Sequence, residues 1–177
     1  MAAQETFEFD VTRWFNSPPL ELEKLRGKVL LVEFFQMLCP GCVNHSLPQA
    51  RRVHQMIKSD QLVVLGIHSV FEHHAVTGPD ALEVFLHEFG ITFPVAVDRP
   101  GEVLPKTMKR WRLEGTPTTM LIDRQGRVRQ TWLGQLDDLA LGVWLGTLLA
   151  EYYPSSCSPS SSHSISSASC SSRASLS

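Results

Sequence analysis

Two cysteines separated by two residues are the clearest chemical feature of this 177-residue sequence. The motif Cys39-Pro40-Gly41-Cys42 brings two thiols within reach of one disulfide if it forms the first turn of a helix. Unpaired backbone N–H groups and the positive end of the helix dipole favour a thiolate at that place. We therefore expect Cys39 to act as a nucleophile and Cys42, one turn inside the helix, to resolve the mixed disulfide that Cys39 forms.

Zinc binding and a permanent disulfide are the alternative interpretations of the motif. A structural zinc site needs a second ligand pair at similar spacing, and the other two cysteines, Cys157 and Cys170, lie far away in the sequence. A disulfide across so short a loop removes little entropy from the unfolded chain. Two inert cysteines would not need Pro40, which suits a first helical turn, or Gly41, which leaves the sulfurs accessible.

The residues around the motif predict a strand before it and a helix after it. The apolar run at residues 29–35 is typical of a buried strand, and residues 43–58 have helical spacing. A second buried strand is expected at residues 62–67. Further along the chain we expect a helix at 81–89, an extended segment at 93–97, a helix at 103–111, a hairpin of strands at 118–123 and 127–133, and a last helix after Leu136. This alternation indicates an α/β fold.

The order of these segments resembles the thioredoxin fold of the TlpA/redoxin type, over residues 14–153. The match includes Gly115-Thr116-Pro117-Thr118 before the hairpin and the lead-in Leu25-Arg26-Gly27-Lys28. Residues 66–72 also resemble a segment of the thioredoxin-like domains of DipZ proteins and of NHL-repeat fusions. The resemblance implies a three-layer α/β fold, with a central mixed sheet, helices on both faces and a TlpA-type insertion helix.

The resemblance also implies how a substrate meets the dithiol. In this family the proline at the place of Pro117 is cis, whereas from the residues alone an X-Pro bond is cis in only about 5% of cases. With a cis bond, Thr116 would present backbone groups beside Cys39, and an extended substrate segment would pair with them as an added strand. We therefore expect Thr116 and Pro117 to bind substrate.

Two departures from the family pattern bear on the site. Leu38 stands where thioredoxins usually have tryptophan, so the apolar surface beside the dithiol differs. Pro48 falls six residues after Cys42 instead of the expected five, which predicts an extra residue or a bulge in that helix.

Glu33 interrupts an apolar strand six residues before Cys39, where thioredoxins carry a buried acid. A desolvated carboxyl has a raised pKa that suits proton transfer near neutral pH. We therefore place Glu33 with Cys39 and Cys42 in the catalytic set, as a proton relay for Cys42. The alternative is a solvent-exposed carboxylate, or one that pairs with Lys28 or an arginine.

Four histidines lie close to the dithiol or to the second strand: His45, His68, His73 and His74. Because the carboxyl ends of parallel strands line the site in an α/β sheet, His68 is placed to approach the dithiol. Their spacing fits no metal-ligand pattern, so we interpret them as residues of a polar loop and leave them out of the catalytic set.

Composition limits the partners that we expect. The hydrophobic fraction of 43% suits one globular domain, and a net charge of −2 gives no reason to expect nucleic acid or an anionic membrane. Residues 1–6 lack the features of a secretory signal, which predicts a cytosolic protein. The apolar stretch at 139–150 is too short to span a bilayer.

Residues 154–177 differ from the preceding domain, which we place at residues 1–153. This segment is rich in serine and poor in apolar residues, so it cannot bury enough surface to order itself and we expect a disordered tail. Cys157 and Cys170 can serve there as distant resolving thiols or form bridges between molecules, and an incidental tail is the interpretation that we favour.

The sequence therefore predicts a thiol–disulfide oxidoreductase that is monomeric or a weak dimer and needs no organic cofactor. Its substrates would be protein or small-molecule disulfides, and a reductase or a thiol pool would supply electrons. One alternative is a peroxiredoxin-like peroxidase, but the Pro-x-x-x-Thr-x-x-Cys pattern is absent, because Val32 and Gln36 hold the proline and threonine places. The other is a copper or zinc carrier that uses Cys39, Cys42 and a histidine.

Overall fold

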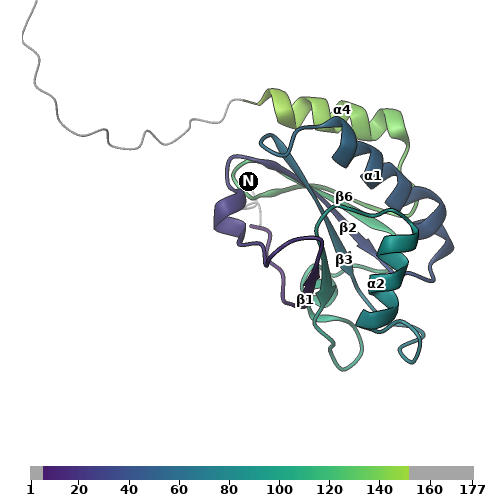
Figure 1. Cartoon of the computed structure of the whole chain (residues 1–177). Coiled ribbons are helices and arrows are strands. Elements are labelled where there is room, and N and C mark those ends of the chain that lie inside the picture. The colour runs from purple at the N-terminus through teal and green to yellow at the C-terminus, as the bar shows by residue number, and fades with distance from the viewer. Residues whose placement is uncertain (1–5, 152–177) are drawn as a thin grey trace, which may run out of the picture.

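A six-stranded mixed sheet organises residues 6–151, the part of the chain that the computed structural model describes (Figure 1). The strand order is β1-β4-β3-β2-β5-β6, with β2, β3 and β4 parallel and β1, β5 and β6 antiparallel to their neighbours. The elements are, in chain order, β1 (Val11–Phe15), the 3-10 helix η1 (Leu22–Leu25), β2 (Val29–Phe35), the π-helical turn η2 (Cys42–Ser46), α1 (Leu47–Met56), β3 (Leu62–His68), α2 (Pro79–Glu88), β4 (Val95–Asp98), α3 (Lys106–Arg110), β5 (Thr118–Ile122), β6 (Val128–Leu133) and α4 (Asp138–Ala150). The predicted α/β thioredoxin-like architecture is confirmed.

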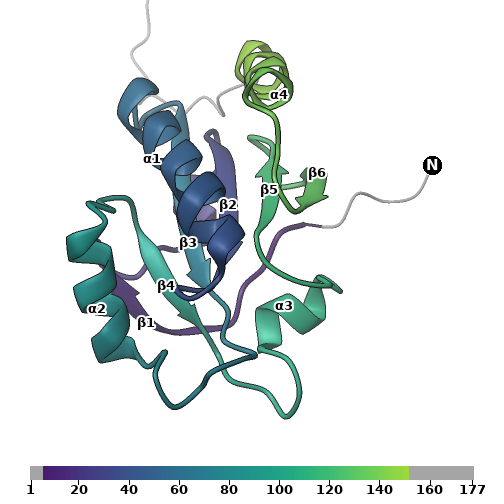
Figure 2. The ribbon, with the colours of Figure 1, turned by 90° about the vertical axis from the view of Figure 1, so that its right-hand side faces the viewer.

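The sheet separates two apolar cores, which gives the three expected layers. Helices α1, α2 and α4 cover one face, and in Figure 2 α1 crosses in front of β2 and β3. Helix α3, η1 and the segment before β1 cover the other face. Because side chains alternate along a strand, Leu31 and Phe35 of β2 belong to the first core, while Leu30 and Val32 belong to the second.

Strand β2 lies at the centre of the sheet and is buried at all seven positions. It pairs with β3 over its whole length and with β5 from Leu30 to Phe34. A strand with neighbours on both sides and helices on both faces has to be apolar throughout, which explains the run that the sequence shows. The chain leaves this central strand at Phe35 and enters the cysteine motif.

Strand β1 and helix α3 differ from the sequence predictions. Strand β1 was not predicted, because it is a short edge strand whose pairing with β4 is irregular between Val11 and Trp14 and therefore lacks strict alternation. The helix expected at 103–111 is shorter and runs only from Lys106 to Arg110. Pro105 provides its N-cap in an extended conformation, and a proline disfavours helical backbone in the residue before it.

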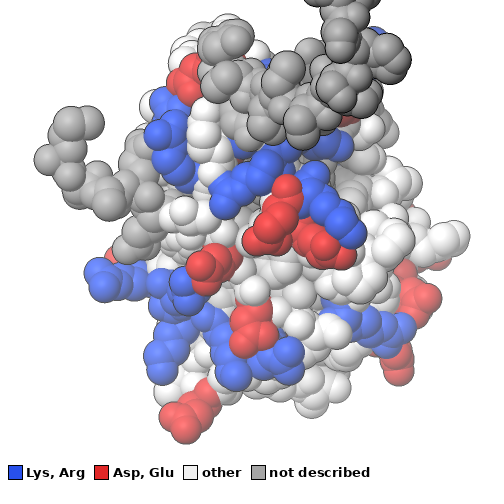
Figure 3. Space-filling model, turned by 90° about the vertical axis from the view of Figure 1, so that its left-hand side faces the viewer, with Lys and Arg blue, Asp and Glu red and all other residues white. Residues whose placement is uncertain are grey.

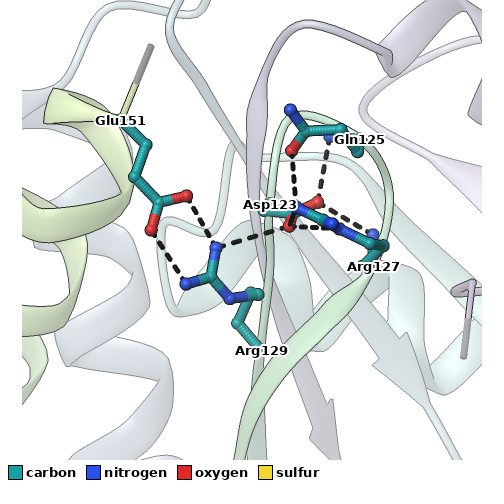
Figure 4. A network of polar contacts seen from close by, with 5 residues as sticks. All are labelled: Asp123, Gln125, Arg127, Arg129 and Glu151. Carbon is teal, nitrogen blue, oxygen red and sulfur yellow. Dashed lines mark hydrogen bonds and ion pairs between the residues drawn. The ribbon is translucent and has the colours of Figure 1, made fainter. Parts of the chain in front are cut away.

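The β5–β6 hairpin and the end of α4 are joined by a network of polar contacts (Figure 4). Asp123 is 2% exposed and accepts hydrogen bonds from the backbone N–H groups of Gln125 and Arg127, which fixes the turn. Arg129 lies between Asp123 and Glu151, at 3.4 Å from the first carboxylate and 2.6 Å from the second. The predicted turn thus also anchors the last helix.

Charged side chains of both signs are mixed on the surface. On the face shown in Figure 3, Lys and Arg side chains lie among Asp and Glu side chains, and neither sign forms a continuous patch. Within residues 6–151, no helix is long and apolar enough to cross a membrane. The predicted domain end at residue 153, the tail and its cysteines Cys157 and Cys170 lie outside the described residues.

Candidate active site

The cysteine motif stands where the sequence predicted it, between the central strand and a helix. Helical backbone begins at Pro40 and continues through Gly41 into the π-helical turn that starts at Cys42. Cys39 is partly exposed, whereas Cys42 is fully buried and packs in the core beneath α1. One sulfur therefore meets solvent and the other does not.

Two polar contacts hold the Cys39 sulfur in place. The Cys42 backbone N–H donates to Cys39 Sγ at 3.2 Å, the contact expected of a sulfur at a helix N-terminus. The Cys39 thiol also lies 3.5 Å from the carbonyl oxygen of Thr116. Both cysteines are free thiols. Burial, and next the neighbouring Cys39, raise the pKa of the Cys42 thiol, while the backbone amide of Gln36 lowers it.

The bulge that the position of Pro48 predicted is present. Residues 42–46 form one π-helical turn before regular helix begins at Leu47. Such a turn accommodates one extra residue without breaking the helix. It also places Ser46, which is 4% exposed, beneath the motif and facing the sheet.

The Thr116–Pro117 peptide bond is cis, as the family resemblance predicted. The loop is held by a hydrogen bond from Thr118 Oγ1 to the Gly115 carbonyl at 2.8 Å and by one from the Gly134 N–H to the Pro117 carbonyl at 2.8 Å. The Thr116 N–H makes no hydrogen bond to any described residue. Backbone groups of Thr116 thus flank Cys39, as expected for a strand-pairing surface.

Glu33 is buried, with 1% of its surface exposed, so the alternative of a solvent-exposed carboxylate is wrong. Thr119 Oγ1 donates to Glu33 Oε2 at 2.8 Å, and Glu33 Oε1 has no partner among the described residues. Burial raises the pKa of Glu33 to about 8, against the lowering influence of the Ser46 and Thr119 hydroxyls. No described arginine or lysine forms an ion pair with it.

The side of β2 that carries Glu33 is the side beneath the dithiol. Glu33 lies on the same face of β2 as Leu31 and Phe35, and both of these belong to the core that contains Cys42. Ser46, which influences the Glu33 carboxyl, lies one turn after Cys42 on the same helix. A buried acid and the buried thiol therefore share one compartment.

The histidines do not gather around the sulfurs. His68 is fully buried at the end of β3, and its Nε2 accepts the backbone N–H of Met37 at 3.4 Å. Burial lowers the pKa of His68 to about 4, so the ring is neutral at pH 7. His73 lines the groove beside Cys39, and His45 lines a different cavity. Within residues 6–151, no three His, Cys, Asp or Glu side chains are grouped as a metal site would require.

A groove of about 450 Å³ opens beside Cys39. One wall is the cysteine motif, the second is the loop after β3, and the third is the cis-proline loop. Leu38 is 53% exposed at this groove, where a tryptophan was expected from the family pattern. The groove is lined by Gln36, Leu38, Cys39, Pro40, Phe71, Glu72, His73, Thr77, Gly115 and Thr116.

The sequence analysis did not predict a structural role for Gln36 at this site. Its backbone carbonyl accepts from the Cys39 N–H at 3.2 Å. Its side-chain oxygen accepts from the backbone N–H groups of Phe71 at 3.2 Å and Glu72 at 3.3 Å. The available signal was a polar residue at the end of an apolar run, three residues before the first cysteine. Gln36 thus ties the cysteine loop to the opposite wall of the groove.

The chain matches the model of the AhpC/TSA family over residues 4–131. It is 31% identical over 130 residues to Protein DipZ of Mycobacterium tuberculosis, covering 72% of this chain and 18% of DipZ. It is 28% identical over 116 residues to the thiol-disulfide oxidoreductase ResA of Geobacillus kaustophilus, covering 65% of this chain and 60% of ResA. The chain therefore spans less than two thirds of either relative.

A solved structure described as a thiol-disulfide isomerase from Corynebacterium glutamicum resembles the whole described fold. It shares 56% sequence identity with this chain, the TM-score is 0.84, and the match covers 86% of this chain and 100% of the other. The resemblance to DipZ domains and to the thioredoxin fold, first inferred from short motifs, is confirmed by these comparisons.

Proposed function

The chain belongs to the AhpC/TSA family, which has the thioredoxin fold, and we propose that it is a thiol–disulfide oxidoreductase using Cys39 and Cys42. The observation that carries the proposal is the pair of free cysteines, one partly exposed and one buried, beside a cis-proline loop. The 56% identity to a protein described as a thiol-disulfide isomerase supports it. So does the 28% identity to ResA.

The proposed reduction proceeds in two thiol–disulfide exchanges. The Cys39 thiolate attacks one sulfur of the substrate disulfide, which forms a mixed disulfide and releases the other substrate sulfur as a thiolate that takes up a proton. Cys42 then loses its proton and attacks Cys39 Sγ, which forms the Cys39–Cys42 disulfide and releases the second substrate thiol. Two electrons pass to the substrate, and a reductase or a thiol pool restores the dithiol.

The order of attack follows from the different surroundings of the two sulfurs. A buried thiol with a raised pKa remains protonated at pH 7 and is inaccessible to a bulky substrate, which describes Cys42. Cys39 is partly exposed, opens onto the groove and receives a backbone N–H. Cys39 is therefore the attacking residue and Cys42 the resolving residue.

Resolution needs a base for the Cys42 proton, and Glu33 is the candidate. Its carboxyl lies in the same buried compartment and has a pKa near 8, so it can accept and return a proton near neutral pH. Its Oε1 has no hydrogen-bond partner among the described residues and is free for this role. Glu33 thereby acts as the proton relay that the sequence suggested.

Thr116 and Pro117 form the surface on which the substrate lies. The free N–H of Thr116 and its carbonyl beside Cys39 supply one edge for an extended segment. Peptides and small disulfides both fit this description. We extend the proposal to a cytosolic setting and to a monomer or weak dimer, which rest on the sequence alone.

A peroxidase of the peroxiredoxin type is the less favoured function. The position of its proline is taken by Val32, which is fully buried within β2. The position of its threonine is taken by Gln36, whose oxygen is already bonded to two backbone amides of the next loop. The groups that shape a peroxide pocket are therefore replaced. The alternative of a copper or zinc carrier would have to rely on Cys39 and Cys42 without a described histidine grouped with them.

The decisive experiment compares disulfide reduction with peroxide consumption, using the full chain and the variants Cys39→Ser and Cys42→Ser. We expect the unmodified protein to reduce insulin disulfides in the presence of dithiothreitol and to consume hydrogen peroxide no faster than free thiol does. Cys42→Ser should accumulate a mixed disulfide on Cys39, seen as a mass increase, and Cys39→Ser should not. Rapid peroxide turnover with no insulin reduction would instead support the peroxidase.

A further inference from the structure

We propose that the side-chain nitrogen of Gln36 binds a carbonyl oxygen of the substrate, which gives the protein a preference for disulfides flanked by uncharged peptide groups. The inference rests on the proposed function and concerns the substrate of the same site. It is carried by the orientation of one carboxamide and by the charges that line the groove.

The orientation of the Gln36 carboxamide is fixed by the groups that it meets. The backbone N–H groups of Phe71 and Glu72 both point at one end of it, at 3.2 and 3.3 Å. Both groups are donors, so the atom between them has to be the oxygen, because the NH₂ end has no acceptor capacity. The nitrogen of Gln36 is therefore directed away from this loop.

That nitrogen is left without a partner. Gln36 as a whole is only 5% exposed, but its nitrogen is not among the fully buried atoms without a partner, so it reaches the open groove. Among residues 6–151, none accepts a hydrogen bond from Gln36 Nε2, and the residue lines the groove beside Cys39. The two N–H donors of this nitrogen are thus available to a molecule that occupies the groove.

The position of Gln36 suits a group attached to the reacting sulfur. Its carbonyl oxygen accepts the Cys39 N–H at 3.2 Å, so its side chain starts directly beneath the attacking residue. The backbone of Thr116 also lies beside Cys39, and its carbonyl oxygen is 3.5 Å from the sulfur. The Gln36 donor and the Thr116 carbonyl acceptor match the C=O and N–H groups of a peptide unit.

The charges around the groove favour a neutral acceptor over an anionic one. Among the described residues that line it, Glu72 is the one with a carboxylate, and no lysine or arginine is present. A substrate carboxylate would meet the like charge of Glu72 and no lysine or arginine, whereas a peptide carbonyl can accept from the Gln36 nitrogen without that repulsion. The preferred partner is therefore an uncharged peptide segment.

The test compares two disulfides in the full-length protein and three variants. One substrate is a cystine peptide with both ends blocked, and the other is bis(2-hydroxyethyl) disulfide, which has no amide. Gln36→Glu keeps an oxygen for Phe71 and Glu72 but replaces the donor by an acceptor, and Gln36→Met removes both. Gln49→Met is the matched control, because Gln49 is 8% exposed and bonds to Leu136 and Asp138, outside the groove.

The quantity to measure is the ratio of kcat/KM for the peptide to kcat/KM for the amide-free disulfide, at pH 8. We expect Gln36→Glu and Gln36→Met each to lower this ratio by up to about tenfold, the effect of one hydrogen bond, and Gln49→Met to leave it unchanged. Using the ratio cancels any change in the reactivity of Cys39 itself, such as the effect of a new charge in Gln36→Glu.

Two outcomes would count against different parts of the account. An unchanged ratio in Gln36→Glu, with both disulfides still reduced, would overturn the role of the Gln36 nitrogen and leave the oxidoreductase intact. Failure of the unmodified protein to reduce either disulfide would overturn the proposed function itself.

Discussion

The backbone of Gly41 lies directly against the ring of Pro117. A Cβ atom on Gly41 would stand 3.1 Å from Pro117 Cδ and 3.6 Å from Pro117 Cγ. The sequence suggested that glycine simply leaves the sulfurs accessible, and the structure adds a closer reason. The residue directly before the second cysteine has to be small because the cis-proline loop packs onto it.

Gly41→Ala should therefore lower disulfide exchange while preserving stability. Gly41 has helical backbone angles, with φ −63° and ψ −36°, and alanine in a helix is favoured over glycine by about 1 kcal/mol. The added methyl group forces Pro117 to shift away from the dithiol, so we expect kcat/KM to fall roughly three- to tenfold, as about 1 kcal/mol would give. Insulin reduction and urea unfolding are the two measurements.

Gly142→Ala is the control for that substitution. Gly142 is a helical residue of α4, and a Cβ there meets nothing within 4 Å. The change should leave exchange unaffected. Equal rates in Gly41→Ala and the unmodified protein would show that contact with Pro117 does not position the loop for exchange.

Glu33→Gln should remove a pH dependence from the resolving step. Only the ionised carboxylate can accept the Cys42 proton, and burial raises the pKa of Glu33 to about 8. Release of substrate from the mixed disulfide should thus accelerate as pH rises and level off above about pH 8. In Glu33→Gln the step should be slower by about 10²-fold or more and lack this inflection. Rapid-mixing kinetics between pH 6 and 10 measure it, and an unchanged profile rules out the relay.

The same substitution should stabilise the fold at alkaline pH. The pKa of Glu33 is near 8 when folded, against an ordinary value of 4.5, so between these values the native state holds a proton that the unfolded chain has released. Stability is therefore present below about pH 4.5 and is lost as pH rises towards 8, by roughly 5 kcal/mol. The advantage of Glu33→Gln in urea unfolding should grow over this range. A constant difference between pH 5 and 8 would mean that the carboxyl is not buried as described.

The parts of the fold that were predictable are those with a strong local pattern. The β2 run was correct at both ends because a strand buried on two faces is apolar throughout. The position of Pro48 revealed the π-helical turn, since one extra residue in a helix has few other solutions. The position of both thiols at the start of a helix was predictable from the two-residue spacing between the cysteines. The cis bond at Pro117 came from the family resemblance, because the residues alone favour a trans bond.

The parts that were missed depend on contacts between distant residues. Strand β1 has an interrupted alternation because it pairs on one side only. His68 seemed free to approach the sulfurs, yet it lies in the core against Met37, 31 residues earlier. Gln36 bonds to backbone groups 35 and 36 residues away, and nothing in its neighbours along the chain indicates that.

His68 should make the protein less stable in acid. Burial lowers the pKa of His68 to about 4 from 6.5, so between these values the unfolded chain binds a proton that the folded ring excludes. The stability that comes from keeping the ring neutral is present above about pH 6.5 and is lost as pH falls to 4, by about 3 kcal/mol. His68→Gln, compared with the unmodified protein by urea unfolding, should remove this loss. His87→Gln, at an exposed site, is the control and should not.

The network around Asp123 should contribute more to stability than any exposed ion pair. The side chain of Asp123 is 2% exposed, accepts two backbone N–H groups and contacts Arg127 and Arg129. Asp123→Ala leaves those partly buried donors without their acceptor, so we expect the free energy of unfolding to fall by about 2–4 kcal/mol. By contrast, Arg13 pairs with acids that are 64% and 99% exposed, and Arg13→Ala should cost less than about 1 kcal/mol. Urea unfolding at pH 7 distinguishes the two, and equal losses would show that the turn does not depend on Asp123.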